Sequence, residues 1–378
     1  MTRFHDPIAP HTPVSPHIRV PPHAPIAPHA PVPPHAPLPH RKVLRNWLTP
    51  LVTRTYIYPL LLLALDYSLL AAALAGVVLA GNVLVKVLCG IAAGLIIGRL
   101  FIIAHDACHQ SLTPSRRLNR WVGRLAFLPS LTPYSLWEVG HNVVHHGYTN
   151  LKGFDFVWAP LTQAEFDALS RPRQWMERLY RSGWAPGLYY GIEIWWRRLF
   201  FPSRASMPTR RPVFMRDCLL VAVFGASVIG LVCWAAVATN QSILLLLALV
   251  VVVPFFVWCS LVGFVLYAHH THVRVGWYDD RTAWGQAQPF VSTTVHLTFR
   301  WKVGALLHHI MAHTAHHVDM SIPLYRLDTA QRTLEHMLPE RIVTQPFSLR
   351  WYRDTARRCK LYDLRTHQWT DFHGIPTT

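Results

Sequence analysis

Three clusters of histidines, in a fixed order along the chain, hold the residues best suited to chemistry. They are His105-Asp-Ala-Cys-His109, His141-Asn-Val-Val-His145-His146 and His313-Thr-Ala-His316-His317. Together they offer eight imidazoles, which is enough to bind two metal ions and to leave positions open for a reaction. Imidazole suits iron, zinc and copper, and a histidine-dominated site without cysteine ligands points first to iron oxidation chemistry.

The spacing within each cluster predicts helices that present the imidazoles on one face. His105 and His109 are four residues apart, so a helix would carry them on the same side. His141 and His145 repeat this spacing, while His146 lies about 100° further around and can face a second ion. The third cluster has the spacing i, i+3 and i+4, which again favours one face. The sequence therefore predicts a joint dimetal site.

The composition indicates a membrane protein. The chain has 378 residues, of which 51% are apolar, and a mean hydropathy of +0.21. Four apolar runs each approach or exceed the ~20 residues that cross a hydrocarbon core; they lie at 55–80, 83–104, 217–238 and 242–267. Short uncharged turns pair them as two hairpins. We expect an all-α integral membrane protein with four transmembrane helices and a helical cap that holds the metal site.

The net charge of +17 and the pI of about 10.1 indicate contact with membrane lipids. Lys and Arg concentrate beside the apolar runs, which is the positive-inside pattern. No nucleic-acid-binding module is recognisable, so the charge predicts lipid headgroups rather than nucleic acid. We expect both termini, the segment 105–216 and the metal site on the cytoplasmic face of a bacterial inner membrane. The six cysteines are scattered and are expected to be small apolar residues.

Three parts of the chain differ in composition. Residues 1–40 form a Pro/His-rich repeat with a histidine every six residues. In polyproline II these histidines would lie roughly 19 Å apart, at ~3.1 Å per residue, so we expect a disordered tail rather than a chelating site. Residues 41–345 form the membrane domain, and residues 346–378 form a cytoplasmic C-terminal tail.

Further residues could complete the site. The fourth run ends in His269-His270-Thr-His272, from which we choose His270 as a ninth ligand and His272 as the alternative. Within the runs, Asp66 is a functional candidate and Arg99 is expected to reach the membrane surface. Neighbours that could orient the imidazoles are Asp106, Glu138, Asn142, Asp155, His272 and His309.

The chain resembles the membrane fatty acid desaturases. The matching stretches lie within roughly residues 50–345 and are HDACHQSL at 105–112, HNVVHHGYTN at 141–150 and HTAHHVDMSIPLY at 313–325. The resemblance implies a diiron centre held by the eight cluster histidines and His270. It implies an enzyme that uses O₂ and two electrons to remove two hydrogens from a lipid- or CoA-linked acyl chain.

Some features of the chain depart from the pattern of that family. Gln110 stands where a glycine or another small or polar residue is common, and the third cluster begins with His313 instead of the glutamine of front-end desaturases. No His-Pro-Gly-Gly motif of a fused cytochrome b5 domain occurs. The resemblance therefore implies an external electron donor, either a ferredoxin or a cytochrome b5.

Two other functions remain open. A diiron hydroxylase or ketolase acting on an alkyl chain or a carotenoid would share these ligands and would transfer oxygen to carbon; the HTAHH…IPLY stretch favours desaturation. A non-enzymatic, histidine-rich membrane metal-binding protein would place ligands within the spans. The clusters here lie outside the apolar runs, which argues against that function.

Overall fold

The four expected spans are confirmed. The computed structural model describes residues 31–33, 35–200, 202 and 211–378. Within this part, four helices are long and apolar enough to cross a membrane: Ile57–Leu79, Val83–Cys108, Pro212–Ala238 and Ile243–His270. The N-terminal repeat from His5 to His29, expected to be a disordered tail, lies outside the described residues.

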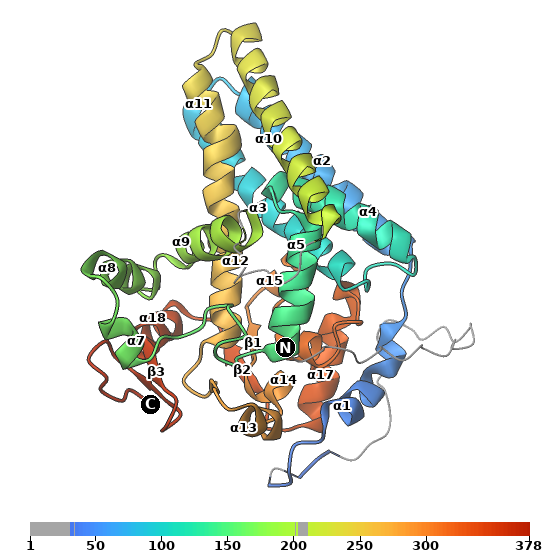
Figure 1. Cartoon of the computed structure of the whole chain (residues 1–378). Coiled ribbons are helices and arrows are strands. Elements are labelled where there is room, and N and C mark those ends of the chain that lie inside the picture. The colour runs from blue at the N-terminus through green and yellow to red at the C-terminus, as the bar shows by residue number, and fades with distance from the viewer. Residues whose placement is uncertain (1–30, 34, 201, 203–210) are drawn as a thin grey trace.

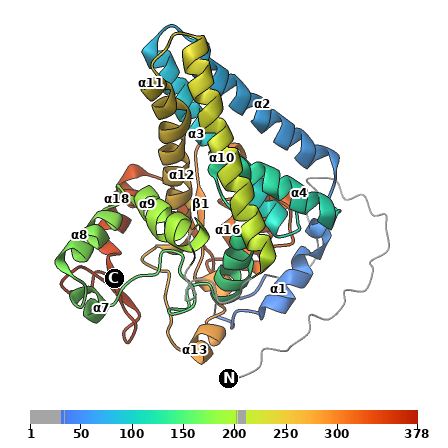
Figure 2. The same cartoon turned by 45° about the horizontal axis from the view of Figure 1, so that its top comes forward.

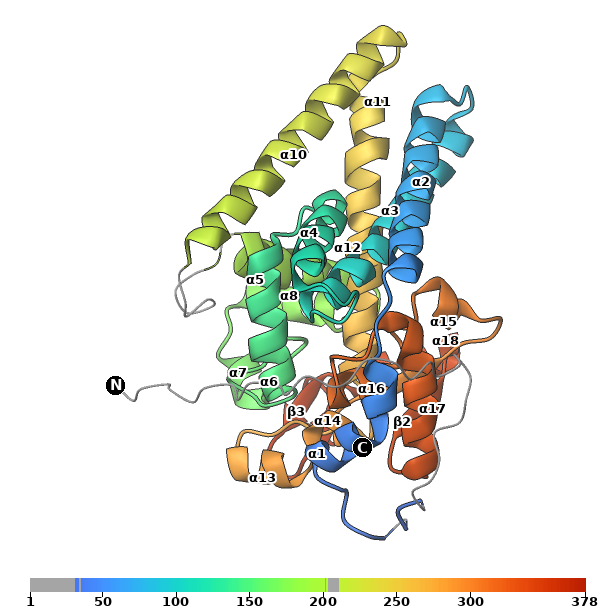
Figure 3. The same ribbon diagram turned by 90° about the vertical axis from the view of Figure 1, so that its right-hand side faces the viewer.

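The spans form two hairpins (Figure 1). The first joins α2 (Ile57–Leu79) to α3 (Val83–Cys108), and the second joins α10 (Pro212–Ala238) to a helix built from α11 (Ile243–Leu247), the π-helix η5 (Ala248–Val252) and α12 (Val253–His270). At the turns, the side chain of Asn82 caps α3 and that of Ser242 caps α11. Both termini of the described chain lie at the end away from these turns, and Figure 3 shows α10 leaning away from the other spans.

Close contact between α3 and α12 fixes the centre of the bundle. Gly90, Gly94 and Gly98 form a stripe on α3, and a Cβ at any of them would meet atoms of the fourth span. Small residues spaced four apart allow transmembrane helices to pack backbone against backbone. This packing matters for function because α3 and α12 carry His105 and His270 on their last turns.

Shorter elements cover the ends of the spans (Figure 2). Two helices precede α2: α1 (Arg41–Leu48) and η1 (Thr49–Val52). Those between the hairpins are α4 (Arg116–Phe127), η2 (Leu128–Ser130), α5 (Tyr134–Glu138), η3 (Val139–His145), α6 (His146–Tyr148), α7 (Gln163–Asp167), α8 (Arg171–Tyr180), α9 (Pro186–Tyr189) and η4 (Tyr190–Phe200). Helices after the fourth span are α13 (Arg281–Gln286), α14 (Pro289–Ser292), α15 (Val303–Leu306), α16 (His313–Val318), η6 (Leu324–Arg326), α17 (Leu327–Met337) and α18 (Leu349–Arg358).

The described residues are mostly helical, as expected, and two short sheets accompany the helices. Strand β1 (Val295–Thr298) pairs in parallel with β2 (Val343–Pro346), and β3 (Leu361–Asp363) pairs antiparallel with β4 (Gln368–Thr370). The C-terminal segment is thus folded: Trp369 is buried, and its indole Nε1 donates to the carbonyls of His272 (3.0 Å) and Val275 (3.1 Å). This segment therefore holds the chain that leaves α12.

We predict that Gly94→Leu will separate α3 from α12. The new side chain would collide with Val257 and with the carbonyl oxygen of Pro254, at 2.5 and 2.8 Å from the ideal Cβ. Overpacking of this kind costs about 1–3 kcal/mol or more, so the thermal unfolding temperature in detergent should fall. Gly230→Leu is the matched control, because a Cβ on this α10 glycine meets nothing within 4 Å. Equal unfolding temperatures for the two variants would contradict the packing described here.

Candidate metal centre

The first cluster lies at the end of α3, which continues as a helix beyond its apolar run. His105 is on the last turn and His109 is the C-cap residue. The carbonyl of Cys108 in this last turn accepts a hydrogen bond from the Nδ2 of Asn142, at 2.9 Å. This bond joins the second cluster to the first.

The second cluster is not α-helical, which corrects the expected spacing. Residues Val139–His145 form a π-helix, in which the backbone bonds from i to i+5. Consequently His141 shares its side with His146, and His145 faces elsewhere. The prediction that His141 and His145 share a face was wrong, because it assumed 3.6 residues per turn. The prediction that His145 and His146 face different ions agrees with the grouping below.

The third cluster occupies α16, a helix of only six residues that depends on its neighbours. The backbone N–H of Ala315 donates to Gln331 Oε1 at 2.9 Å. At the other end, Arg41 of α1 donates to the carbonyls of His317 (2.9 Å) and Val318 (3.0 Å). Side chains from α17 and α1 thus satisfy the helix ends, which otherwise lack partners. The three histidines divide between two groups, contrary to the single face expected.

The structure brings all nine predicted ligands into two buried groups. Within each group the candidate ligand atoms lie within 4.8 Å of one another. Metal–nitrogen bonds of roughly 2.0–2.1 Å place ligands on opposite sides of one ion about 4 Å apart, so each group has the size of a metal site. The first group is His105, His109, His141, His146 and His316, and the second group is His145, His270, His313 and His317.

The nitrogens of the first group are too crowded to be explained by hydrogen bonding. Their Nε2 atoms form a chain of contacts: His109–His105 at 3.3 Å, His105–His141 at 2.8 Å, His141–His146 at 3.1 Å and His146–His316 at 3.0 Å. A neutral Nε2 either donates one proton or offers one lone pair. Five atoms in a chain can therefore make at most two of these four contacts as hydrogen bonds. Convergence on a shared cation accounts for all of them.

Burial keeps these imidazoles neutral, as ligation requires. Desolvation is the main cause that holds the pKa of His109, His141 and His146 well below 6.5. The same cause lowers the pKa of His313, His316 and His317. Neighbouring imidazoles lower these pKa values further. Neutral nitrogens keep a lone pair for a metal ion across the physiological pH range.

Two histidines of the second group have partners that set which nitrogen faces inward. The Nδ1 of His145 lies 3.1 Å from both oxygens of Asp155, and its buried Nε2 has no hydrogen-bond partner. Asp155 is itself held by the backbone N–H groups of Asn150 (2.9 Å) and Val157 (3.0 Å). The Nδ1 of His270 donates to the carbonyl of Thr293 at 3.2 Å. Both arrangements turn Nε2 toward the other ligands of the group, and the Nε2 of His270 lies 2.9 Å from that of His313.

The other predicted neighbours bond elsewhere. Asp106 accepts from Ser111 and from the backbone of Leu324, and Asn142 donates to Cys108. Glu138 accepts from Tyr134 at 3.4 Å, and burial raises its pKa. His272 lies 3.3 Å from Gln345. His309 belongs to neither histidine group, and its charged neighbours include Asp328 and Arg332 of α17. None of these contacts joins a ligand imidazole side chain.

Two contacts were not predicted from the sequence. The ring of Trp137 stacks on His141, with centroids 4.9 Å apart. His269 stacks on His313 at 3.7 Å, and its Nε2 lies 3.1 Å from the sulfur of Met311. The first contact has a signal in the sequence, since Trp137 precedes His141 by four residues. No sequence pattern predicts the second contact, because His269 and His313 belong to segments that are far apart along the chain.

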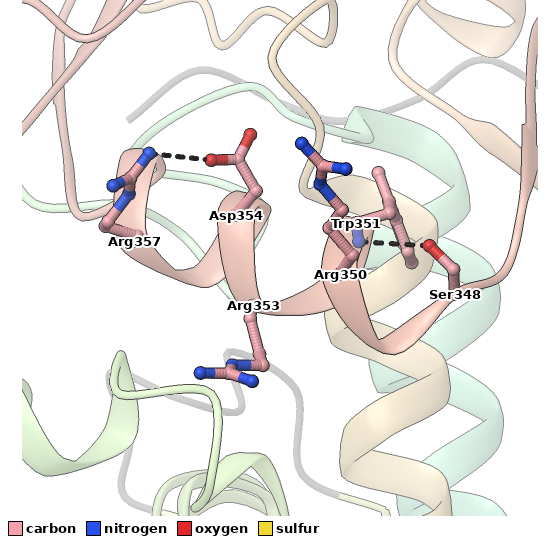
Figure 4. A pocket seen from close by; sticks show the side chains of 6 residues that line it. All are labelled: Ser348, Arg350, Trp351, Arg353, Asp354 and Arg357. Atoms are coloured by element: carbon pink, nitrogen blue, oxygen red, sulfur yellow. Dashed lines mark hydrogen bonds and ion pairs between the residues drawn. The ribbon is translucent and has the colours of Figure 1, made fainter.

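Two hollows differ in their relation to this site. A narrow, mostly apolar cavity reaches His141 and is lined by Trp137, Gly140, His141, Phe156, Val157, Ile194, Leu199 and Leu266. A surface groove on α18 is bordered by Ser348, Arg350, Trp351, Arg353, Asp354 and Arg357 (Figure 4). No residue of the groove belongs to either histidine group. The cavity is therefore the hollow that adjoins the metal centre.

We predict that Asp155→Asn will weaken metal binding. The amide would orient the His145 imidazole less well than the carboxylate, and losing such outer partners costs roughly 10–100-fold in metal affinity. Titration of the metal-free protein with Co²⁺, monitored by the visible absorption of the bound ion, measures the metal affinity. Asp167→Asn is the matched control, because Asp167 is exposed on α7 and accepts from Gln163. Unchanged Co²⁺ affinity in Asp155→Asn would remove Asp155 from the site.

The same region of the chain matches known proteins. An sn-1 oleoyl-lipid 12-desaturase of Picosynechococcus sp. is 27% identical over 277 residues, which cover 72% of this chain and 75% of that protein. The sn-1 acyl-lipid omega-3 desaturase (ferredoxin) of Synechocystis sp. is 28% identical over 253 residues, covering 65% and 66%. The chloroplastic omega-6 fatty acid desaturase of Spinacia oleracea is 28% identical over 273 residues, covering 71% and 58%.

A family profile covers the whole of the metal centre. Residues 81–348 match the family described as fatty acid desaturase, and this range contains all nine histidines of the two groups. The match extends over more than half of the chain and ends just before α18. The chain belongs to the fatty acid desaturase family.

Proposed function

We propose that this protein is an O₂-dependent fatty acyl desaturase that introduces a double bond into the acyl chain of a membrane lipid. The observation that carries the proposal is the pair of adjacent, buried histidine groups within the family-matched region. The ring centroids of His146, in the first group, and His317, in the second, are only 4.3 Å apart. Two metal ions bound there could therefore act on one substrate.

We assign two iron ions to the two groups. A methylene C–H bond resists acids, bases and nucleophiles, so bound iron together with O₂ would supply the oxidising power. Reduction of O₂ to two waters takes four electrons, of which the acyl chain gives two and an external donor gives two. The nine histidines offer only nitrogen ligands, which suit iron. Asp155 and the Thr293 carbonyl would keep two of them in the binding tautomer.

The protein's own part is to bind and place the acyl chain. The cavity beside His141 is lined mainly by apolar side chains from α5, η3, η4 and α12 and the segment 156–157. The cavity has room for about one water molecule, so an acyl chain would have to widen it to lie beside the first histidine group, away from bulk water. The position of the double bond would then depend on how far the chain can enter. Side chains such as Val157 and Leu199 would set that depth.

The names of the relatives guide the choice of substrate and donor. Two of them are named for acyl-lipid substrates and one of these names includes ferredoxin. We therefore favour a membrane lipid over acyl-CoA, and a ferredoxin-type carrier over cytochrome b5. Arginines of α4, among them Arg116, Arg117 and Arg120, lie on the same side as the metal centre. By the positive-inside rule we place this side in the cytoplasm, at a bacterial inner membrane.

Expression of the chain in a host that supplies ferredoxin tests the proposal. We predict that the host lipids gain an unsaturated acyl chain, and that His316→Ala abolishes this product because the first group loses a ligand. His336→Ala is the matched control, since this exposed histidine of α17 lies in neither group. Gas chromatography with mass spectrometry of derivatised acyl chains locates the double bond. A hydroxy or keto product would instead indicate an oxygenase, and equal products from wild type and His316→Ala would refute the proposal.

A change in cavity volume should alter which chains are accepted. We predict that Val157→Phe shortens the accepted acyl chain or lowers its conversion, because the larger ring would fill the space beside His141. Val157→Ala enlarges the same space and should keep activity on the chains that wild type uses. Competition assays with acyl chains of different length measure the ratio of kcat/KM. Identical chain-length profiles for both variants would exclude this cavity as the acyl site.

A further inference from the structure

A largely buried cluster of charged and polar side chains joins the first hairpin to a later loop, apart from the two histidine groups. Asp66 is 0% exposed near the middle of α2, and Arg99 lies on α3. Arg99, which was expected to reach the membrane surface, donates through Nε and Nη2 to Asp66 Oδ1 at 2.9 and 2.7 Å. Ionisable residues inside a membrane span are costly and are retained where they serve a purpose.

The third member of the cluster comes from a distant part of the chain. The Nε2 of His308 donates to Asp66 Oδ2 at 2.9 Å, across 242 residues of sequence. Arg99 Nη1 also donates to the backbone carbonyl of Leu306. Both oxygens of the carboxylate therefore accept hydrogen bonds, and the first hairpin is hydrogen-bonded to the loop 299–312 at Leu306 and His308.

This loop adopts a backbone that would not be stable alone. Trp301, Lys302, His308 and His309 all have φ between 49° and 58°. The left-handed region costs a residue with a side chain roughly 1–2 kcal/mol. External contacts must offset this strain, and the bonds to Asp66 and Arg99 are placed to do so.

The loop is followed directly by the third histidine cluster, with buried and hydrogen-bonded residues between them. After His308, Ile310 and Met311 are buried, in one cluster with Ile102 of α3 and Ala268 of α12. The N–H of Ala312 donates to the carbonyl of His309 at 2.9 Å, and α16 begins at the next residue. The position of His308 therefore constrains where His313 lies.

We propose that Asp66, Arg99 and His308 form a positioning clamp that holds the loop 299–312 so that His313 and His317 complete the second histidine group. The clamp acts through the backbone, since His308 belongs to neither group and its Nε2 is bonded to Asp66. Asp66 precedes the family-matched residues 81–348. The inference about metal occupancy rests on the proposed diiron function, whereas the inference about the loop does not.

His308 and its neighbour provide a matched pair of variants. His308→Ala removes the bond to Asp66, whereas His309→Ala changes an adjacent, half-buried histidine with the same left-handed backbone. His308→Gln keeps a side-chain N–H that can reach the carboxylate. A clamp predicts that the protection of residues 299–318 from amide exchange is highest in wild type and His309→Ala, lower in His308→Gln and lowest in His308→Ala. The affinity for the second ion should follow the same order. A general loss of packing predicts no rescue by glutamine.

Two measurements on the purified full chain test the clamp. Amide hydrogen exchange of the metal-free protein should become faster in residues 299–318 in His308→Ala and stay unchanged in His309→Ala. After loading with Fe²⁺, His308→Ala should bind the ion of the second group roughly tenfold more weakly, the scale of lost outer support. The ion of the first group should be affected less, because that group has one ligand on α16 and the second group has two. If His308→Ala cannot be purified, Asp66→Asn and His308→Gln take its place and should show the same two changes in smaller degree.

The outcomes separate the clamp from the proposed function. Faster exchange with no iron bound even by wild type would support the clamp and refute the diiron assignment. Two bound irons in every variant, with equal exchange in residues 299–318, would overturn the clamp and leave the proposed function intact.

Discussion

Nine imidazoles are buried together with their nitrogens converging, and the other elements of the structure serve to bring them there. Burying a polar nitrogen without a hydrogen-bond partner is unfavourable, and the Nε2 atoms of His145 and His317 have none. A hydrogen-bonded network cannot satisfy the contacts of the first group, and burial opposes protonation. Bound cations resolve both difficulties, so the arrangement is best understood as built for metal ions.

The scaffold places these histidines by extending membrane helices beyond their apolar lengths. α3 continues to Cys108 and α12 to His270, so two spans carry ligands on their final turns. The glycine stripe of α3 brings these helices together. The remaining ligands come from the C-cap of α3, from the adjoining short helices η3 and α6, and from α16. Side chains of other elements hold α16 in place. Departures from the α-helix are frequent at functional sites, and the π-helix here directs His145 and His146 to different groups.

The sequence predicted the features that follow from local patterns. Apolar length predicted the four spans, and the positions of the clusters after or between them predicted a common site. The sequence did not predict the π-helix of the second cluster, because two histidines four residues apart do not distinguish a π-helix from an α-helix. It also could not distinguish Asp155 from Asp106 or Glu138, since only the fold brings Asp155 to His145. The bond between Asp66 and His308 joins a membrane span to a loop 242 residues away, which no periodicity indicates.

Anomalous X-ray scattering at the iron absorption edge, from crystals of the iron-loaded protein, would locate the metal ions. We predict two peaks: one among the Nε2 atoms of the first group and one within the second group, next to the unpartnered Nε2 of His145. Iron bound only at other histidines, such as those of the N-terminal repeat, or no ordered iron in a protein that still desaturates lipids, would contradict this prediction.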